Sequence, residues 1–349
     1  MKFSLRLPFA AILFYLLLPQ LSPAQNTENP GEYMTAIANA RGDMDSKYMQ
    51  YMSAAAHGRG ARKVERLRQQ VLESITQSRY KTIDLPKFKG DNSLRQSSID
   101  YIQMCYRVFN EDFQKIVDLE ELAEQSIDEM QAFLLLQEKV SERLQQASDT
   151  LHKAIADFAT KYNVKLVDDK SALGEKMEAA GKVNSYSNDV FIAFFKANWQ
   201  DSKVVEAMNN KKVNEIEQTR NALLQYANEG IKALDTLRTF NSDPTLANAC
   251  RQVLQYYKTT AESDIPKLTD FYLKQENFEK IKRDFDGKPQ SKRTRQDVDA
   301  YNKAIKDINE AINKFNQANN AINKGRNQVL QNWSAAQKKF SDTHMPYYR

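Results

Sequence analysis

Apolar residues recur every three or four positions along most of this chain, the pattern of amphipathic helices. The clearest case is a stretch near the C-terminus, which we expect to be helical over 293–341. Its apolar positions alternate steps of three and four, and the strip comprises Val298, Tyr301, Ile305, Ile308, Ile312, Phe315, Ile322, Val329, Trp333, Ala336 and Phe340. Such a strip packs along its length in a helical bundle or coiled coil.

Two polar residues, Asn319 and Arg326, interrupt this strip. They either set the register of packing or contact a ligand, or else the strip is partly exposed beside Gly325. We favour exposure, because register-setting polar residues are best attested in coiled coils.

The N-terminal half predicts four helices. Asn29-Pro30-Gly31-Glu32 offers a capping asparagine, a proline at the first helical position and a glutamate that closes a capping box. The helix that begins there is expected to end near Ala56, before the turn His57-Gly58-Arg59-Gly60. Three further helices are expected, up to residue 80, over 93–110 and over 111–162.

The second half repeats this plan after a displacement of 152 residues. Leu85-x-x-Phe88-x-x-Asp91-x-x-Leu94 has its counterpart in Leu237-x-x-Phe240-x-x-Asp243-x-x-Leu246. Helical periodicity alone produces such matches by chance, but these positions lie in a loop, outside any helical repeat. Helices are expected over 185–209, 211–239, 244–280 and 293–341, with a kink at Pro266.

The sequence therefore predicts an all-α fold of two tandem antiparallel helical bundles, with about four helices each and a long C-terminal helix. The bundles are expected over residues 25–162 and 183–349. Glycines and paired aspartates predict a linker at 163–182. The last five residues, Met345 to Arg349, have no helical pattern and are expected to be loosely attached.

The first 24 residues predict a secretion signal. Lys2 and Arg6 precede an apolar stretch of about a dozen residues, too short for a bilayer core that needs ~20. Small residues at Ser22 and Ala24 favour cleavage between Ala24 and Gln25. No later segment is apolar enough to span a membrane. We therefore expect an exported protein, in the periplasm, at the cell surface or secreted.

Charge and cysteine content limit the functional classes. The chain carries a net charge of +5, of which Lys2 and Arg6 leave with the signal. The near-neutral remainder argues against a nucleic-acid binder. Cys105 and Cys250 could form one disulfide in an oxidising compartment, and each equally suits a buried thiol, which we favour.

The sequence offers no catalytic motif, and we predict a non-enzymatic protein without a cofactor. The three histidines, His57, His152 and His344, lack metal-ligand spacing, and Asp149-x-x-His152 occurs singly. Glu120, Glu124 and Asp128 share one helix face, where a cation could relieve their repulsion, but such rows are usually solvated.

Two further groups of residues have a functional and a structural interpretation. The basic run 280–295 could touch an anionic surface, but a solvated loop is favoured. The aromatic helix over 186–199 could expose an interface, but core packing is the default.

Four stretches resemble a family of exported surface proteins of spirochaetes and Bacteroides-like bacteria. They are Tyr51-Met52-Ser53-Ala54-Ala55-Ala56-His57-Gly58, Ala61-Arg62-Lys63-Val64-Glu65, Leu85-Pro86-Lys87-Phe88-Lys89-Gly90-Asp91 and Lys115-Ile116-Val117-Asp118-Leu119-Glu120-Glu121-Leu122-Ala123-Glu124-Gln125. The resemblance covers mainly residues 30–165. It implies a Gram-negative envelope location and an all-helical body, and it transfers no active site.

The first hypothesis is thus a non-enzymatic envelope or surface protein that binds another macromolecule. A coiled-coil adaptor or self-assembling oligomer, with the final helix as its interface, is the second. A helical metal-binding protein or enzyme, with Glu120 and Glu124 in its site, is the third.

Overall fold

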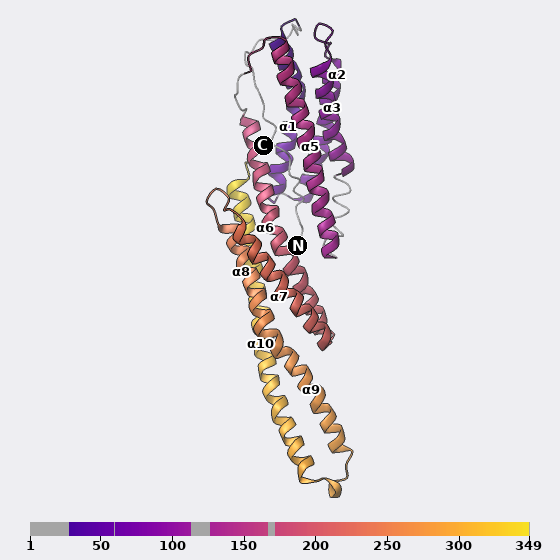
Figure 1. Ribbon diagram of the computed structural model, residues 1–349, viewed down its shortest axis with the longest axis vertical. Coiled ribbons are helices and arrows are strands. Elements are labelled where there is room, and N and C mark those ends of the chain that lie inside the picture. Colours follow the sequence, from indigo (N-terminus) through magenta and orange to yellow (C-terminus); the bar gives the residue numbers. More distant parts are fainter. Residues whose placement is uncertain (1–27, 59, 113–125, 167–171, 349) are drawn as a thin grey trace. The chain divides into compact units, whose positions relative to one another are not determined.

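The computed structural model describes residues 28–58, 60–112, 126–166 and 172–348, and every regular element within them is helical (Figure 1). The prediction of an all-α fold with a long C-terminal helix is confirmed. The predicted cleavage point at Ala24 and Gln25 lies outside the described residues, as do Glu120 and Glu124. The elements are α1 (Pro30–Ala56), α2 (Ala61–Asp84), α3 (Ser93–Arg107), η1 (Val108–Asp112), α5 (Ile127–Lys161), α6 (Ala172–Asn209), α7 (Val213–Thr236), α8 (Thr245–Thr259), η2 (Thr260–Asp264), α9 (Ile265–Asp286), η3 (Gln290–Lys292) and α10 (Arg295–His344).

The chain divides into two compact units. Unit 1 comprises Met1–Tyr186 together with Lys338–Arg349, and unit 2 comprises Ser187–Gln337. The division falls inside α6 and inside α10, so each of these helices contributes to both units. The units therefore differ from the predicted bundles 25–162 and 183–349, because the last twelve residues belong with unit 1.

The predicted linker at 163–182 is wrong over its second half, which forms the start of α6. Met177, Ala180 and Val183 recur every three residues and are buried. A glycine inside a helix costs about 1 kcal/mol relative to alanine. Burial of this stripe outweighs the cost of Gly174 and Gly181. These two glycines are the reason that the sequence interpretation placed a linker here.

The repeat at a displacement of 152 residues is present in the backbone itself. We call residues 61–112 the first copy and residues 213–264 the second copy. Each copy consists of two helices followed by a five-residue π-helix, and all bounds correspond at that displacement. The pairs are α2 with α7, α3 with α8, and η1 with η2.

The turn between the paired helices is also the same in both copies. Phe88 and Asp91 form an isolated antiparallel bridge, with N···O distances of 3.0 and 2.8 Å. Asp91 then accepts a hydrogen bond from the backbone N–H of Ser93 at 2.8 Å, which stabilises the start of α3. Phe240, Asp243 and Thr245 repeat the bridge and the 2.8 Å bond in the second copy.

The residues at the tip of this turn adopt left-handed backbone conformations. In the first copy Lys89 has φ 48° and Gly90 has φ 85°; in the second, Asn241 and Ser242 have φ 47° and 64°. Such values are uncommon for residues other than glycine, asparagine and aspartate. The shared turn is therefore held by its own bridge and cap rather than by glycine at both positions.

The kink predicted at Pro266 coincides with the π-helix η2, which immediately precedes α9. A proline cannot donate the backbone hydrogen bond that a continuous helix needs. Proline is not the only cause, however, because η1 has the same form in the first copy, where position 114 is glutamine.

Aromatic residues from several elements form the core of unit 1. Tyr33, Phe88 and Phe158 are buried with ring centroids 5.2–5.7 Å apart, which joins α1, the first-copy turn and α5. The cluster also contains Met34, Ile37, Ala40, Leu85, Leu94 and Ala159.

Unit 2 packs α10 against α6. Phe194 stacks on Trp333 at 4.8 Å, and both side chains are fully buried. About two turns further along both helices, the guanidinium of Arg326 donates two hydrogen bonds to the Asp201 carboxylate, at 2.7 and 2.9 Å. The preferred interpretation of Arg326 as an exposed interruption is therefore wrong, since it forms an interhelical ion pair. Asn319 Oδ1 accepts a hydrogen bond of 3.4 Å from the side-chain amide of Asn323 on the same helix.

Candidate functional site

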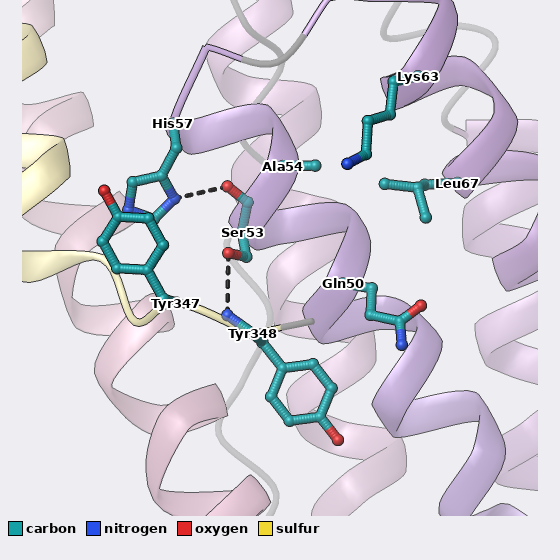
Figure 2. Close-up of a pocket in the computed structure, with 8 residues that line it drawn as sticks. All are labelled: Gln50, Ser53, Ala54, His57, Lys63, Leu67, Tyr347 and Tyr348. Carbon is teal, nitrogen blue, oxygen red and sulfur yellow. Dashed lines mark hydrogen bonds between the residues drawn. The ribbon is translucent and has the colours of Figure 1, made fainter.

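Unit 1 contains a cavity of about 320 Å³ between the C-terminal end of α1 and the first two turns of α2 (Figure 2). The C-terminal segment of the chain forms one of its walls. The residues that line it are Gln50, Ser53, Ala54, His57, Lys63, Leu67, Tyr347 and Tyr348.

The C-terminal segment is fixed to α1, contrary to the prediction that it is loosely attached. The backbone N–H of Tyr348 donates to Ser53 Oγ at 3.0 Å, and its hydroxyl lies 3.1 Å from Ser46 Oγ. Lys176 Nζ donates to the Tyr347 carbonyl at 3.2 Å, and Met345 is buried. These contacts join residues far apart in the chain, so no local pattern predicts them.

His57 connects the end of α1 to this segment. Its Nδ1 lies 2.7 Å from the Ser53 carbonyl oxygen, which can only accept, so Nδ1 carries a proton. In the neutral ring Nε2 is then an acceptor, and this buried atom has no hydrogen-bond partner among the described residues. The imidazole stacks on Tyr347 with centroids 3.7 Å apart and 25° between the planes.

The charge of the cavity is positive. Of the described residues that line it, Lys63 is the only one with a full charge, and no carboxylate is among them. Figure 2 shows the Lys63 ammonium directed toward Ala54, in the space between α1 and α2. Gln50 Oε1 accepts from Lys47 at 3.4 Å, so the amide NH₂ of Gln50 remains available as a donor.

A second candidate is the pair of helices α9 and α10 in unit 2, which extends past α7 and α8 (Figure 1). None of residues 270–303, all of which the structure describes, is buried. We call this stretch, with the following part of α10 to Phe315, the arm. Phe285 stacks on Tyr301 at 4.4 Å and Arg293 lies 4.2 Å above the Phe285 ring, so the two helices are held together at the tip.

Only part of the predicted strip of α10 is buried in the arm. Ala304, Ile308 and Ala311 are buried, whereas Val298 and Ile312 are 39% and 38% exposed. The rings of α9 contact two larger residues of the strip, because Phe271 packs on Phe315 at 4.6 Å and Phe285 on Tyr301 at 4.4 Å. Val298 and Ile312 lie on one flank of α10 together with the half-buried Tyr301 and Ile305.

The two cysteines are separate buried thiols rather than a disulfide. Cys250 Sγ donates to the Val190 carbonyl at 3.6 Å. Burial raises the pKa of both thiols to about 12, so neither is a thiolate at neutral pH. The structure therefore has the buried-thiol alternative at both positions, and neither thiol is suited to nucleophilic chemistry.

The remaining sequence candidates do not form a centre. No three His, Cys, Asp or Glu side chains among the described residues are arranged to hold a metal ion. Asp149 accepts from Gln145, and the basic run contains the ion pairs Lys282–Asp286 and Lys288–Asp297. The aromatic helix mainly packs inward, with Phe194 and Phe195 buried.

Sequence interpretation missed a buried polar cluster in unit 1. Arg41 and Asp45 lie one turn apart on α1 and are 4% and 2% exposed. Burial raises the pKa of Asp45 to about 7, against a smaller lowering effect of Arg41. The Arg41 guanidinium lies 5.9 Å from the centroid of Tyr101 on α3. Their spacing of four within an apolar stretch was the available signal.

Within the part of the chain that the structure describes, no helix has both the length and the apolar character to cross a bilayer. No protein-family model, curated protein or solved structure matches the chain.

Proposed function

We propose that this is an exported, non-enzymatic envelope or surface protein whose arm binds another protein. The observation that carries the proposal is the run of residues 270–303, all of them described and none of them buried. Stable helices in water normally bury an apolar face against other elements. The arm adds little to a core and presents a long helical surface instead.

The flank of α10 gives this surface its character. Val298 and Ile312 are fourteen positions apart, which is about 21 Å of helix. Exposed apolar side chains along one line of a helix suit an amphipathic helix of a partner, which packs at the same spacing. Two lysines of the basic run are paired with aspartates, Lys282 with Asp286 and Lys288 with Asp297, and the apolar flank of α10 favours a protein partner.

The test is binding by the mature protein, residues 25–349, and by a double variant, Val298→Ser with Ile312→Ser. Partners captured from envelope extract are identified and purified, and affinity is then measured directly. The double variant should bind at least about tenfold more weakly, because two exposed apolar side chains together contribute over 1.4 kcal/mol.

Leu273→Ser is the matched control. Leu273 is 51% exposed on α9 and lies on the side away from Phe271 and Phe278, which face α10. It should leave affinity unchanged. Equal binding by the double variant would refute the proposal. Light scattering separates the self-assembly alternative, in which the wild type is an oligomer and the double variant a monomer.

A further inference from the structure

We propose that the cavity of unit 1 binds an anionic group, a carboxylate or a phosphate, held by Lys63 and Gln50 beside the C-terminal tyrosines. This site is separate from the arm and does not depend on it. The inference starts from the lining of the cavity, in which the described residues supply one cation, one available amide donor and no carboxylate.

Lys63 has no ion-pair partner among the described residues, in contrast to other lysines of unit 1. Lys81, for example, donates to Asp43 at 2.7 Å, and Lys153 donates to Asp157 at 2.6 Å. A lysine directed into a space between two helices, without a carboxylate, is suited to an external anion. Charge-assisted hydrogen bonds of this kind are about twice as strong as neutral ones.

The first turns of α2 reinforce this charge. Arg62, Lys63 and Arg66 stand at the N-terminal end of the helix, whose first turn has no acidic residue and whose N-cap, Gly60, supplies no side-chain bond. Basic side chains are unfavourable there, because the helix dipole already places partial positive charge at this end. An anion in the adjacent cavity would offset the charge of these side chains and the partial charge of the helix end.

The second copy provides an internal comparison. Helix α7 begins at the position equivalent to the start of α2, and its first turn contains Glu215, which accepts from Lys212 at 2.9 Å. Lys63 of the first copy is equivalent to Glu215 of the second, so the charge at this position is reversed. Both residues occupy the same place in equivalent helices, so helix formation does not require the positive charge, which occurs in the copy that has the cavity.

Two groups complete the site from the other side. The buried Nε2 of His57, a residue that lines the cavity, has no hydrogen-bond partner among the described residues. The rings of Tyr347 and Tyr348 form an aromatic wall, which suits a ligand whose anionic group is attached to an apolar or planar body.

The experiment is calorimetric titration of the mature protein with sodium phosphate and, separately, sodium acetate, at constant ionic strength set by sodium chloride. The two probes distinguish a phosphate from a carboxylate source. Saturable binding of either supports the site, and Lys63→Gln should weaken it about tenfold, the effect of losing one charge-assisted contact.

Lys87→Gln is the matched control, because Lys87 is an exposed lysine of the same unit outside the cavity. It should bind the anion as the wild type does. A chain shortened after Pro346, which lacks both tyrosines of the wall, should also bind more weakly, with its helical circular dichroism retained.

Saturable binding of neither anion would overturn the proposal, and so would equal binding by the wild type and Lys63→Gln. Equal weakening in Lys87→Gln would show a general charge effect and would also overturn it. The double variant of the arm should bind the anion normally, so failure of the arm proposal remains distinguishable from failure of this one.

Discussion

The two copies have the same helices, turn and π-helix, yet their surroundings place buried charge in different ways. In unit 1, Arg41 and Asp45 are neighbours on one helix, and the positions displaced by 152 residues are alanines, Ala193 and Ala197. In unit 2, Asp201 of α6 is paired with Arg326 of α10, and the position equivalent to Asp201 is Met49.

This difference shows that a repeated backbone does not determine its own polar interior. An interhelical pair with two short hydrogen bonds fixes the register of α10 against α6. Arg41 and Asp45 lie on the same helix, and the main effect of burial there is to raise the pKa of Asp45. The predictions below test this contrast, from the largest expected effect to the smallest.

Asp201→Ala should destabilise unit 2 by about 3–5 kcal/mol, because it leaves the half-buried Arg326 guanidinium without its carboxylate. Trp199 and Trp333 both lie in unit 2, so tryptophan fluorescence in a urea titration reports on this unit. The control is Asp286→Ala, which breaks an exposed pair and should cost less than about 1 kcal/mol. Equal losses would remove the distinction between the two kinds of pair.

Unit 1 should lose stability as pH rises from about 4 to about 8. The pKa of Asp45 is raised from 3.8 in the unfolded chain to about 7 in the folded protein. The protonated carboxyl therefore stabilises the fold fully below pH 3.8, and this stabilisation is lost as the pH rises through about 7. A shift of this size corresponds to about 4 kcal/mol at most. Hydrogen exchange of α1 and α3 measures it.

Asp45→Asn should remove this part of the pH dependence, since the amide does not titrate. The stability of the variant must be compared with that of the wild type at each pH. Asp91 of the same unit has a lowered pKa, so its stabilising effect is lost as the pH falls rather than as it rises. Parallel pH curves for wild type and variant would contradict a buried, titrating Asp45.

Two helical glycines should respond to alanine with opposite signs. At Gly325, an added Cβ would lie 2.6 Å from Tyr256 Cε2, so the ring that donates to the Ile322 carbonyl must move, at a cost of about 1–3 kcal/mol. At Gly42 nothing lies within 4 Å, and alanine should add up to about 1 kcal/mol through helix propensity. Thermal unfolding of the two variants decides the sign at each position.

The turn of the first copy should be sensitive to the charge of Asp91. Asp91 accepts from Lys161 at 2.8 Å and from the Tyr162 hydroxyl at 3.0 Å, in addition to its cap bond. These bonds hold the pKa of Asp91 well below the ordinary range. The charged carboxylate therefore stabilises the fold at neutral pH, and this stabilisation is lost on acidification. Asp91→Asn should cost about 1 kcal/mol or less at pH 7, measured by urea titration against Asp243→Asn.

Local patterns were enough to predict the helices and the repeat. The Asn29 cap starts α1 at Pro30 as expected, with Asn29 Oδ1 accepting from Gly31 and Glu32. The loop motif around Phe88 and Asp91 was legible because its apolar residues fall outside a helical period. The start of α6 was missed, because two glycines outweighed a stripe whose burial depends on distant elements.

The candidate sites were less accessible from sequence. His57 was judged by its lack of metal-ligand spacing, and its partner Tyr347 lies 290 positions away in the chain. Nothing in the sequence around Lys63 singled it out, and only the cavity shows that its described lining residues include no carboxylate. The exposed flank of the arm depends on which residues of α10 pack against α9. The periodic strip in the sequence does not show which of its residues are covered by α9.

The sequence by itself determined the all-helical character, the helix starts and the repeated turn, because capping, turn conformation and amphipathic spacing act over a few residues. Only the tertiary structure decided that Arg326 pairs with Asp201, that Asp45 is buried with a raised pKa, and that the last residues close a positive cavity. Each of these depends on a side chain from a distant segment, which sets local burial and charge that no short pattern contains.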